Sequence, residues 1–486
     1  MRYLLLLSLF LFVPVTFSQQ RWERTYGRVS CDAGFSAQQT SDGGYIVAGW
    51  TYSVPPFIAY AVYLVKTDSF GDTIWTRCLG NQFVNMGFSV QQTADGGYIV
   101  AGYTGPGYVG PYDFYLVKTD SFGDTIWTRT YGGTEDDMGS SVQQTFDGGF
   151  IIAGGTSSFG AGGYDFYLVK TDSFGDTIWT RTYGGEEADV GYSVQQTTDG
   201  GYIIAGGTRS FGAGGVDVYL VKTDSFGDTI WTRTYGGEED DDARSVQQTT
   251  DGGYIVAGWT YSFSTGDSAD VYLIKTDANG DTIWTRTYGG EKNVCGYGVQ
   301  QTADGGYIIA GWTGIFSTGD SADVYLIKTD ANGDTIWTRT YGSASIHDLG
   351  FSVQQTADGG YIIAGRTYTA GAGDVYLIKT DSLGLVSTGV EEQRTKPLPN
   401  LLLDVSPNPF TKTATIRYQL PSATPVRILA FDITGRTVAT LFDQNQPAGT
   451  HQLIWQPKGL AQGIYFIKLQ LPGFITTERC LYLNQE

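Results

Sequence analysis

The sequence predicts an all-β protein, and three of its features support that fold class. Its 486 residues include 68 Gly, 33 Tyr, 25 Phe and 11 Trp but only 3 Met, a composition that suits short strands joined by tight turns. A unit marked by Asp-Gly-Gly followed by Tyr or Phe recurs seven times, and each complete copy contains four strand-length runs. Four antiparallel strands repeated at a regular period indicate a seven-bladed β-propeller with four-stranded blades.

The first element is an apolar N-terminal leader. Arg2 precedes the apolar run 4–15, and small polar residues lead up to Ser18. This pattern is typical of a secretory signal peptide, so we expect residues 1–18 to be removed after export. The run is shorter than the ~20 residues that cross a bilayer. Because no other segment is apolar enough to span one, the sequence predicts no transmembrane anchor.

The repeat itself is assigned to residues 19–386. Its Asp-Gly-Gly turns begin at residues 42, 95, 147, 199, 251, 304 and 358, a spacing of 52 to 54 residues. A typical unit reads SVQQT, YIIAG, DVYLVKTD and TIWTRTYG, and the first and third turns are rich in residues that tolerate positive φ. Each unit is therefore expected to form one blade.

The two ends of the repeat array are offset by one strand. The fourth strands carry seven tryptophans: Trp22, Trp75, Trp127, Trp179, Trp231, Trp284 and Trp337. The last unit lacks its own fourth strand, whereas residues 22–27 have no unit in front of them. We predict that residues 22–27 form the outer strand of the last blade, whose inner strands lie at about 352–381. This pairing closes the ring and removes an exposed strand edge.

The repeat also resembles a known family over residues 22–388. YGGEEADVGYSVQQTTDGGYIIAGGT followed by YLVKTDSFGDTIW is similar to the seven-bladed β-propeller repeats of exported bacterial proteins. Kelch repeats have a similar period, but here Tyr202 directly follows Gly201 and Trp231 comes much later, which departs from kelch spacing. The resemblance implies a fold and no particular activity.

The C-terminal part of the chain has a different pattern. Residues 387–400 lose the period and gain charge and proline, which predicts a linker. Residues 401–486 contain alternating strand-length runs and are expected to form a small Ig-like β-sandwich. They resemble the type A C-terminal sorting domain of type IX secretion. The matching motif residues are Ser406, Pro407, Asn408, Pro409 and Phe410, then Gly435 and Arg436 within 431–436, and finally Gly463, Ile464, Tyr465 and Phe466.

This resemblance implies a route of export and a cellular location. The family's members are read by the type IX secretion machinery, which carries its cargo across the outer membrane of a diderm bacterium. The expected location is extracellular or on the outer cell surface. An ordinary accessory β-sandwich is the alternative.

Charge and cysteine usage exclude other classes. The formal net charge is −20, so a phosphate backbone would be repelled and nucleic acid is not an expected partner. Cys31, Cys78, Cys295 and Cys480 lie at four different places in the pattern without CxxC spacing. The sequence therefore predicts neither a cysteine metal site nor a disulfide framework.

Three successive loops between blades form an acidic arc on the face opposite the Asp-Gly-Gly turns. Its eleven acids are Glu135, Asp136, Asp137, Glu186, Glu187, Asp189, Glu238, Glu239, Asp240, Asp241 and Asp242. The functional interpretation is a ligand site that concentrates cations or a basic partner. The alternative is a solvated surface that serves solubility alone.

Two long loops on the same face, 51–61 and 103–112, are rich in aromatic residues and proline. Tyr60 and Tyr108 are the candidate ligand-binding residues there, and Tyr52, Phe57, Tyr103 and Tyr112 accompany them. These rings are expected to stack on sugars or protein side chains, or else to pack locally. A surface glycan or a protein is therefore the expected partner.

Metal binding and catalysis have little support. Asp277, Asn279 and Asp281 superficially resemble a calcium loop, but the distant bidentate Glu is absent, and an Asn-Gly hairpin turn explains the same letters. The chain has only two histidines, His347 and His451, and no nucleophile elbow. We therefore expect a secreted or cell-surface binding protein without cofactor or catalytic residues. The alternative is a secreted glycan-active hydrolase or lyase.

Overall fold

The computed structural model contains two compact units, residues 1–387 and 388–486. The structure describes residues 21–27, 31–52, 60–80, 84–107, 110–264, 266, 268–314, 321–343, 346–369, 372–386, 403–420, 423–432, 436–471 and 474–483. The predicted signal peptide (1–18) and linker (387–400) lie outside these residues. Every regular element among the described residues is a β-strand, and none of these residues forms a helix suited to crossing a membrane.

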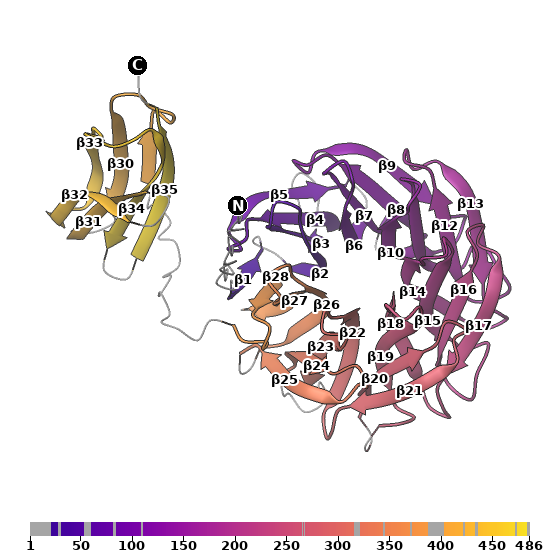
Figure 1. Cartoon of the computed structure of the whole chain (residues 1–486). Coiled ribbons are helices and arrows are strands. Elements are labelled where there is room, and N and C mark those ends of the chain that lie inside the picture. The colour runs from indigo at the N-terminus through magenta and orange to yellow at the C-terminus, as the bar shows by residue number, and fades with distance from the viewer. Residues whose placement is uncertain are drawn as a thin grey trace, which may run out of the picture. The chain divides into compact units, whose positions relative to one another are not determined.

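The first unit is a ring of seven four-stranded antiparallel sheets around a central axis (Figure 1). Blade 1 contains β2 (Asp32–Gln39), β3 (Tyr45–Tyr52), β4 (Tyr60–Thr67) and β5 (Thr73–Leu79). Blade 2 contains β6 (Val84–Gln92), β7 (Tyr98–Gly105), β8 (Asp113–Thr119) and β9 (Thr125–Tyr131). Blade 3 contains β10 (Asp137–Gln144), β11 (Phe150–Thr156), β12 (Asp165–Thr171) and β13 (Thr177–Tyr183). Blade 4 contains β14 (Asp189–Gln196), β15 (Tyr202–Thr208), β16 (Asp217–Thr223) and β17 (Thr229–Tyr235).

The remaining blades repeat this order. Blade 5 contains β18 (Asp241–Gln248), β19 (Tyr254–Thr260), β20 (Asp270–Thr276) and β21 (Thr282–Tyr288). Blade 6 contains β22 (Asn293–Gln301), β23 (Tyr307–Gly314), β24 (Asp323–Thr329) and β25 (Thr335–Tyr341). Blade 7 contains β26 (Asp348–Gln355), β27 (Tyr361–Thr369), β28 (Ala372–Thr380) and, from the other end of the repeat, β1 (Trp22–Tyr26). The predicted seven-bladed propeller is confirmed.

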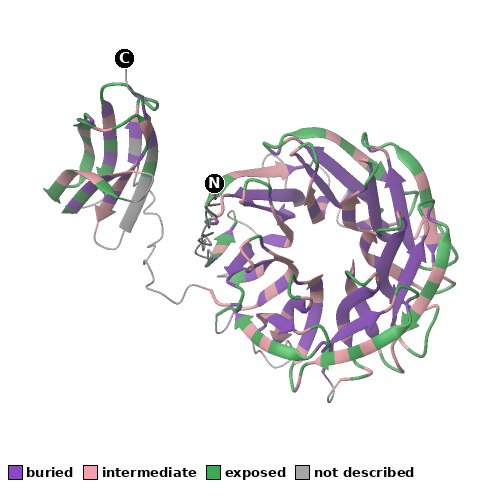
Figure 2. Ribbon diagram, in the orientation of Figure 1, coloured by how far each residue is buried: buried purple, intermediate pink, exposed green. Residues whose placement is uncertain are grey.

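The core of the propeller lies between blades. The second and third strands are apolar on both faces, as in YIIAGGT and DVYLVKT of blade 4, because a neighbouring blade covers each face. One such cluster joins Ile151 and Phe166 of blade 3 to Val194, Tyr202 and Ile204 of blade 4. The fourth strands form the outer wall, where half-buried and exposed side chains alternate (Figure 2). The repeated apolar residues thus form the same interface between each pair of neighbouring blades.

The predicted closure of the ring is also confirmed. Strand β1 pairs antiparallel with β28, with Trp22 opposite Lys379 and Tyr26 opposite Val375. Trp22 is buried against Tyr45 of blade 1 at a ring-centroid distance of 5.6 Å. The Tyr26 hydroxyl donates to the Gly71 carbonyl of blade 1 at 2.7 Å. The first and last blades therefore meet through the same contacts as the others.

A ring of side-chain hydrogen bonds runs around the axial channel. In each first strand, the penultimate glutamine accepts through Oε1 from the last backbone N–H of the next blade's first strand, at 2.5–2.7 Å. The accepting residues are Gln38, Gln91, Gln143, Gln195, Gln247, Gln300 and Gln354. The bond from Gln39 to Gln354 crosses the closure, so the ring of bonds is continuous.

The Asp-Gly-Gly turns are held by buried lysines of the third strands. In blade 2 the Lys118 Nζ lies 2.9 Å from the Asp95 carboxylate, while Thr93 and the Gly97 N–H also donate to Asp95. Burial raises the pKa of Asp95, but the hydrogen bonds from Lys118 and Thr93 outweigh it and hold the pKa at about 2. The pairs with the same geometry are Lys66–Asp42, Lys170–Asp147, Lys222–Asp199, Lys275–Asp251, Lys328–Asp304 and Lys379–Asp358.

The second unit is a two-sheet β-sandwich. One sheet contains β29 (Leu403–Ser406), β30 (Ala414–Leu420) and β33 (Gly449–Trp455). The other contains β31 (Thr424–Asp432), β32 (Thr437–Gln446), β34 (Gly463–Leu471) and β35 (Phe474–Tyr482). Residues of both sheets, among them Ile416, Trp455, Tyr465 and Ile467, meet in one buried cluster.

The sorting-motif residues have structural roles in this sandwich. Phe410 is buried against Trp455 and Tyr482, and its backbone N–H and carbonyl bond to β35 and to Leu483. The Asn408 side chain accepts from the Leu481 N–H at 2.9 Å. The Tyr465 hydroxyl donates to the Ala461 carbonyl, the Arg436 guanidinium bonds Asp432, and Gly463 has φ 158° at the start of β34. Pro407 and Pro409 flank Asn408, and Gly435 lies outside the described residues.

Candidate ligand-binding site

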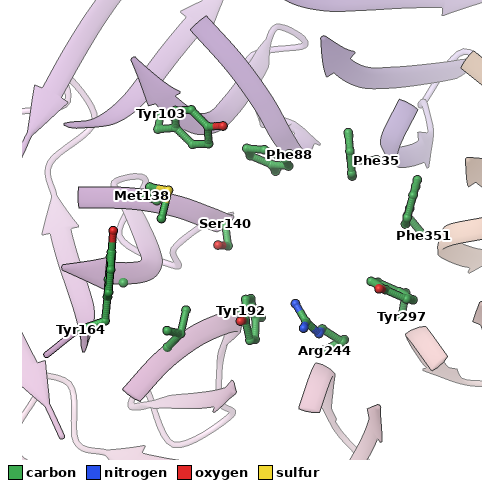
Figure 3. Close-up of a pocket in the computed structure, with 13 residues that line it drawn as sticks. Phe35, Phe88, Tyr103, Met138, Ser140, Tyr164, Tyr192, Arg244, Tyr297 and Phe351 are labelled. Atoms are coloured by element: carbon green, nitrogen blue, oxygen red, sulfur yellow. The ribbon is translucent and has the colours of Figure 1, made fainter. Parts of the chain in front are cut away.

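The first strand of every blade contains a β-bulge that directs one residue toward the axis. In blade 3 the register with the second strand slips between Gly139 and Ser141, so that Ser140 has no partner in the ladder. The residues at this position form the axial ring: Phe35, Phe88, Ser140, Tyr192, Arg244, Tyr297 and Phe351. All seven are half-buried and line one cavity of about 440 Å³ (Figure 3).

The axial ring is one of the places where the seven copies of the repeat differ. The two glutamines that end each first strand are the same in every copy, whereas the bulge residue is aromatic in five blades, serine in blade 3 and arginine in blade 5. A residue needed only to build a blade would be repeated with the rest of the pattern. The axial-ring residues therefore differ from blade to blade, whereas the glutamines of the same strands do not.

Aromatic rings form a continuous wall on one side of the cavity. Phe35 stacks on Phe351 with centroids 4.7 Å apart and meets Phe88 edge-on at 4.9 Å. The wall continues from Phe351 to Tyr297 at 5.4 Å and from Phe88 to Tyr103 at 5.5 Å. Since these contacts fix the rings in place, their faces and edges are arranged before any ligand arrives.

Arg244 is the charged member of the axial ring. Its guanidinium lies 3.9 Å from the ring centroid of Tyr192 and 5.6 Å from that of Tyr297, within the range of cation–π attraction. The Arg244 Nη2 also lies 2.8 Å from Asp242 Oδ2. This combination fixes a normally mobile side chain at the cavity, where a quarter of its surface stays exposed.

Asp242 is buried beneath this arginine. Burial raises the pKa of the Asp242 carboxyl to about 6, although the Arg244 charge acts in the opposite direction. Asp242 Oδ1 and Arg244 Nε are both buried without a hydrogen-bond partner among the described residues. The ion pair thus retains an unused acceptor and an unused donor.

The cavity extends towards blades 3 and 4. Met138, Ser140, Tyr164 and Val190 line it there, together with Gly155 on the second strand of blade 3. The residue at the place of Gly155 is tryptophan in blades 1, 5 and 6, namely Trp50, Trp259 and Trp312. A Cβ added at Gly155 would lie 3.3 Å from Tyr164 and Val190, so a larger side chain at this place would project among the residues that line the cavity.

The acidic arc predicted from the sequence is only partly exposed. Its five glutamates, Glu135, Glu186, Glu187, Glu238 and Glu239, are exposed, whereas Asp136 and Asp240 are half-buried and Asp137, Asp189, Asp241 and Asp242 are buried. Asp137 accepts hydrogen bonds from the Gly133 N–H and from the hydroxyls of Thr156 and Ser158. Asp136 and Asp240 accept from the backbone N–H groups of Tyr112 and Val216.

The two aromatic loops are divided between packing and the cavity. Tyr60 lies against Trp50 and Tyr52 with ring centroids 5.1 Å apart in both cases. Tyr103 lines the cavity and contacts Tyr112 at 4.9 Å. Tyr108 and Phe57 lie outside the described residues.

The calcium-like turn is held by its own backbone. Asp277 Oδ1 accepts from the N–H groups of Asn279 at 2.8 Å and Asp281 at 2.9 Å, and Asp281 lies 3.3 Å from Arg233 of the preceding blade. Within the described parts of the chain, no three His, Cys, Asp or Glu side chains are grouped as metal ligands. The geometry is that of a hairpin turn with an ion pair to the preceding blade.

Comparisons with known proteins identify the second unit. Residues 404–480 match the family model of the secretion system C-terminal sorting domain, in agreement with the motif residues described above. The chain is therefore a secreted β-propeller protein with a type IX sorting domain, directed to the cell surface or beyond it by the secretion machinery.

Similarity elsewhere is distant. The regulatory protein FlaEY of Caulobacter vibrioides is 26% identical over 198 residues, which cover 35% of this chain and 20% of that protein. PorZ, a bacterial surface component of the type IX secretion system of Porphyromonas gingivalis, is 13% identical with a TM-score of 0.41, covering 91% of this chain and 58% of PorZ. An ancestral GH74 enzyme is 11% identical with a TM-score of 0.39, covering 95% of this chain and 58% of the enzyme. This chain thus spans about a fifth of its curated relative.

Proposed function

We propose that this secreted propeller is a binding protein that holds its ligand in the axial cavity and performs no catalysis. The observation that carries the proposal is the axial ring, because its residues differ between blades that are otherwise close copies. The cavity volume of about 440 Å³ falls within the ~300–1,000 Å³ typical of small-ligand sites. Its lining is mostly aromatic with a few polar groups, which is also typical of such sites.

The alternative is a glycan-active hydrolase or lyase built on the same fold. Most glycoside hydrolases need two carboxyl groups about 5–9.5 Å apart on either side of the scissile bond. None of the described residues that line the cavity carries a carboxylate, and the nearby Asp242 is engaged with Arg244. These observations favour binding over hydrolysis.

Only the five exposed glutamates of the acidic arc are proposed to affect ligand binding. These glutamates belong to loops that lead directly into first strands β10, β14 and β18, whose bulge residues line the cavity. Glutamates placed there give the surroundings of the cavity a negative potential. In this proposal they select ligands by charge, while the axial ring supplies the contact surface.

The test is to fill the cavity without disturbing the blades. Gly155→Trp introduces the side chain that three other blades carry at this place, so the variant is expected to fold with a small shift of Tyr164 and Val190 and to lose ligand binding. Phe146→Ser, at an Asp-Gly-Gly turn where the ring is 75% exposed, is the control and should keep binding. The mature chain would be applied to an array of oligosaccharides and peptides, with polysaccharide turnover assayed in parallel. Turnover, or binding that Gly155→Trp leaves intact, would contradict the proposal.

A further inference from the structure

We propose that the axial cavity binds a neutral oligosaccharide. This inference rests on the function proposed above and adds the chemical class of the ligand. The shape of the cavity wall, the charges around it and the polar groups of its lining support this class.

The wall offers flat apolar surfaces of the kind that sugar rings cover. Four rings contact one another in the order Phe88, Phe35, Phe351 and Tyr297, with neighbouring centroids 4.7 to 5.4 Å apart. The C–H faces of a pyranose pack on aromatic faces, whose negative quadrupole attracts the slightly positive C–H groups. A wall of several adjoining rings suits a ligand with more than one sugar unit.

The charges around the cavity disfavour ions of either sign. Arg244 occupies the aromatic site that a ligand cation would seek, lying between Tyr192 and Tyr297. Its own charge is compensated by Asp242 at 2.8 Å, so it does not offer a free cation to a carboxylate or sulfate group. The exposed glutamates of the acidic arc and the formal charge of −20 repel anions further. A neutral ligand remains.

The polar groups at the cavity match hydroxyls. A guanidinium has five N–H donors, and Arg244 bonds Asp242 through Nη2 while a quarter of its side chain stays exposed at the cavity. The buried Asp242 holds the guanidinium there, and the exposed N–H groups of Arg244 can donate to the hydroxyl oxygens of a sugar. The Ser140 hydroxyl, which can both donate and accept, is a further polar group of the lining.

The axial ring can be altered without removing the propeller core. Its seven residues belong to none of the hydrophobic clusters between the blades. Tyr297→Ala therefore removes one ring face from the cavity, and Tyr297→Phe, which keeps the ring, is the matched control. Asp242→Asn combined with Arg244→Gln removes both charges together and leaves neither one buried alone.

The experiment measures binding of the mature full chain to defined probes at two salt concentrations. The probes are neutral cello-, manno-, xylo- and chito-oligosaccharides, an oligogalacturonate as the acidic probe and an oligolysine as the basic one. We expect at least one neutral series to bind, with an affinity that 0.5 M salt leaves unchanged because no net charge is neutralised. Tyr297→Ala should weaken that binding about three- to tenfold, the loss that one stacked ring implies, and Tyr297→Phe should not. The double charge variant should also weaken it.

Two results would overturn the inference, and they can be told apart. Salt-sensitive binding of the acidic or the basic probe that Gly155→Trp abolishes would place a charged ligand in the cavity, which refutes the neutral class and keeps the proposed function. If no probe of any class binds in a way that depends on Gly155 or Tyr297, both the inference and the proposed function fail. Circular dichroism of each variant confirms that it is folded.

Discussion

Removing the Trp22 side chain tests whether the non-covalent closure holds the ring together. Trp22 is 6% exposed, meets Tyr45 of blade 1 at 5.6 Å and donates from Nε1 to the Ser69 carbonyl at 3.2 Å. Trp22→Ala therefore leaves a cavity and removes an aromatic pair and a hydrogen bond. Replacing a buried tryptophan by alanine costs about 3–5 kcal/mol, of which the aromatic pair accounts for ~0.5–1.5 kcal/mol.

Trp127→Ala is the matched control for this variant. Trp127 occupies the same place on β9, is half-buried and meets Phe150 of blade 3 at 5.9 Å. Strand β9 stays attached to its partner β8 through the short turn 120–124, whereas β1 is joined to β28 only through the rest of the ring. Once its anchor is lost, β1 gains far more freedom than β9, because a long loop costs more entropy to close.

The assay is amide hydrogen exchange of the mature chain, combined with denaturant unfolding. Trp22→Ala should lower the free energy of unfolding by about 3–5 kcal/mol and should accelerate exchange along β28, which becomes an edge strand when β1 detaches. Trp127→Ala should cost less and leave exchange in β8 nearly unchanged. Equal protection of β28 in the wild type and in Trp22→Ala would show that closure by β1 does not hold the last blade.

Two further predictions concern address and acid stability. Deleting residues 400–486 should leave a folded propeller in the periplasm, because folding and export depend on separate units; normal surface delivery of the shortened chain, detected by protease accessibility on intact cells, would refute this. The lowered pKa of Asp95, about 2, means that its pairing with Lys118 stabilises the fold above pH ~4, the pKa of an unfolded aspartate, and that this stability is lost as the pH falls through about 2. Denaturant titrations should therefore show a shallower loss of stability below pH 4 for Asp95→Asn, and an unchanged slope would count against the pair.

The architecture could be predicted from the sequence because it is repeated. The seven blades have similar sequences, so the period and the four strands of each blade are evident without any contact information. The closure followed from counting, since Trp22 supplies the fourth strand that the last unit lacks. The sorting domain was indicated by motif residues such as Phe410 and Tyr465, which the structure places in the core of the sandwich.

The axial ring could not be predicted by strand alternation. In an unbroken strand, Phe35 and Ser36 would point to opposite faces, but the bulge between Gly34 and Ser36 shifts the register by one residue. A signal was nevertheless present, because aligning the seven copies shows that the residue after the glycine (Ala243 in blade 5) varies while the glutamines do not. The acidic loops are only partly exposed for a related reason. One acid of each run, namely Asp137, Asp189 or Asp241, is already the first residue of a strand, where a turn N–H group binds it.

The topology of blade 7 has a mechanical consequence when force is applied to the chain through its C-terminal sorting domain. The chain leaves the propeller from β28, which is an interior strand with β27 on one side and β1 on the other. A pull applied beyond residue 386 therefore acts on a strand held by two hydrogen-bonded ladders, one of which is formed by the opposite end of the propeller sequence. Such a pull shears both ladders at once, whereas an edge strand would peel away one bond at a time. Strand β28, which is nearest the sorting domain in the sequence, can therefore be pulled out only if its pairing with both β1 and β27 is broken.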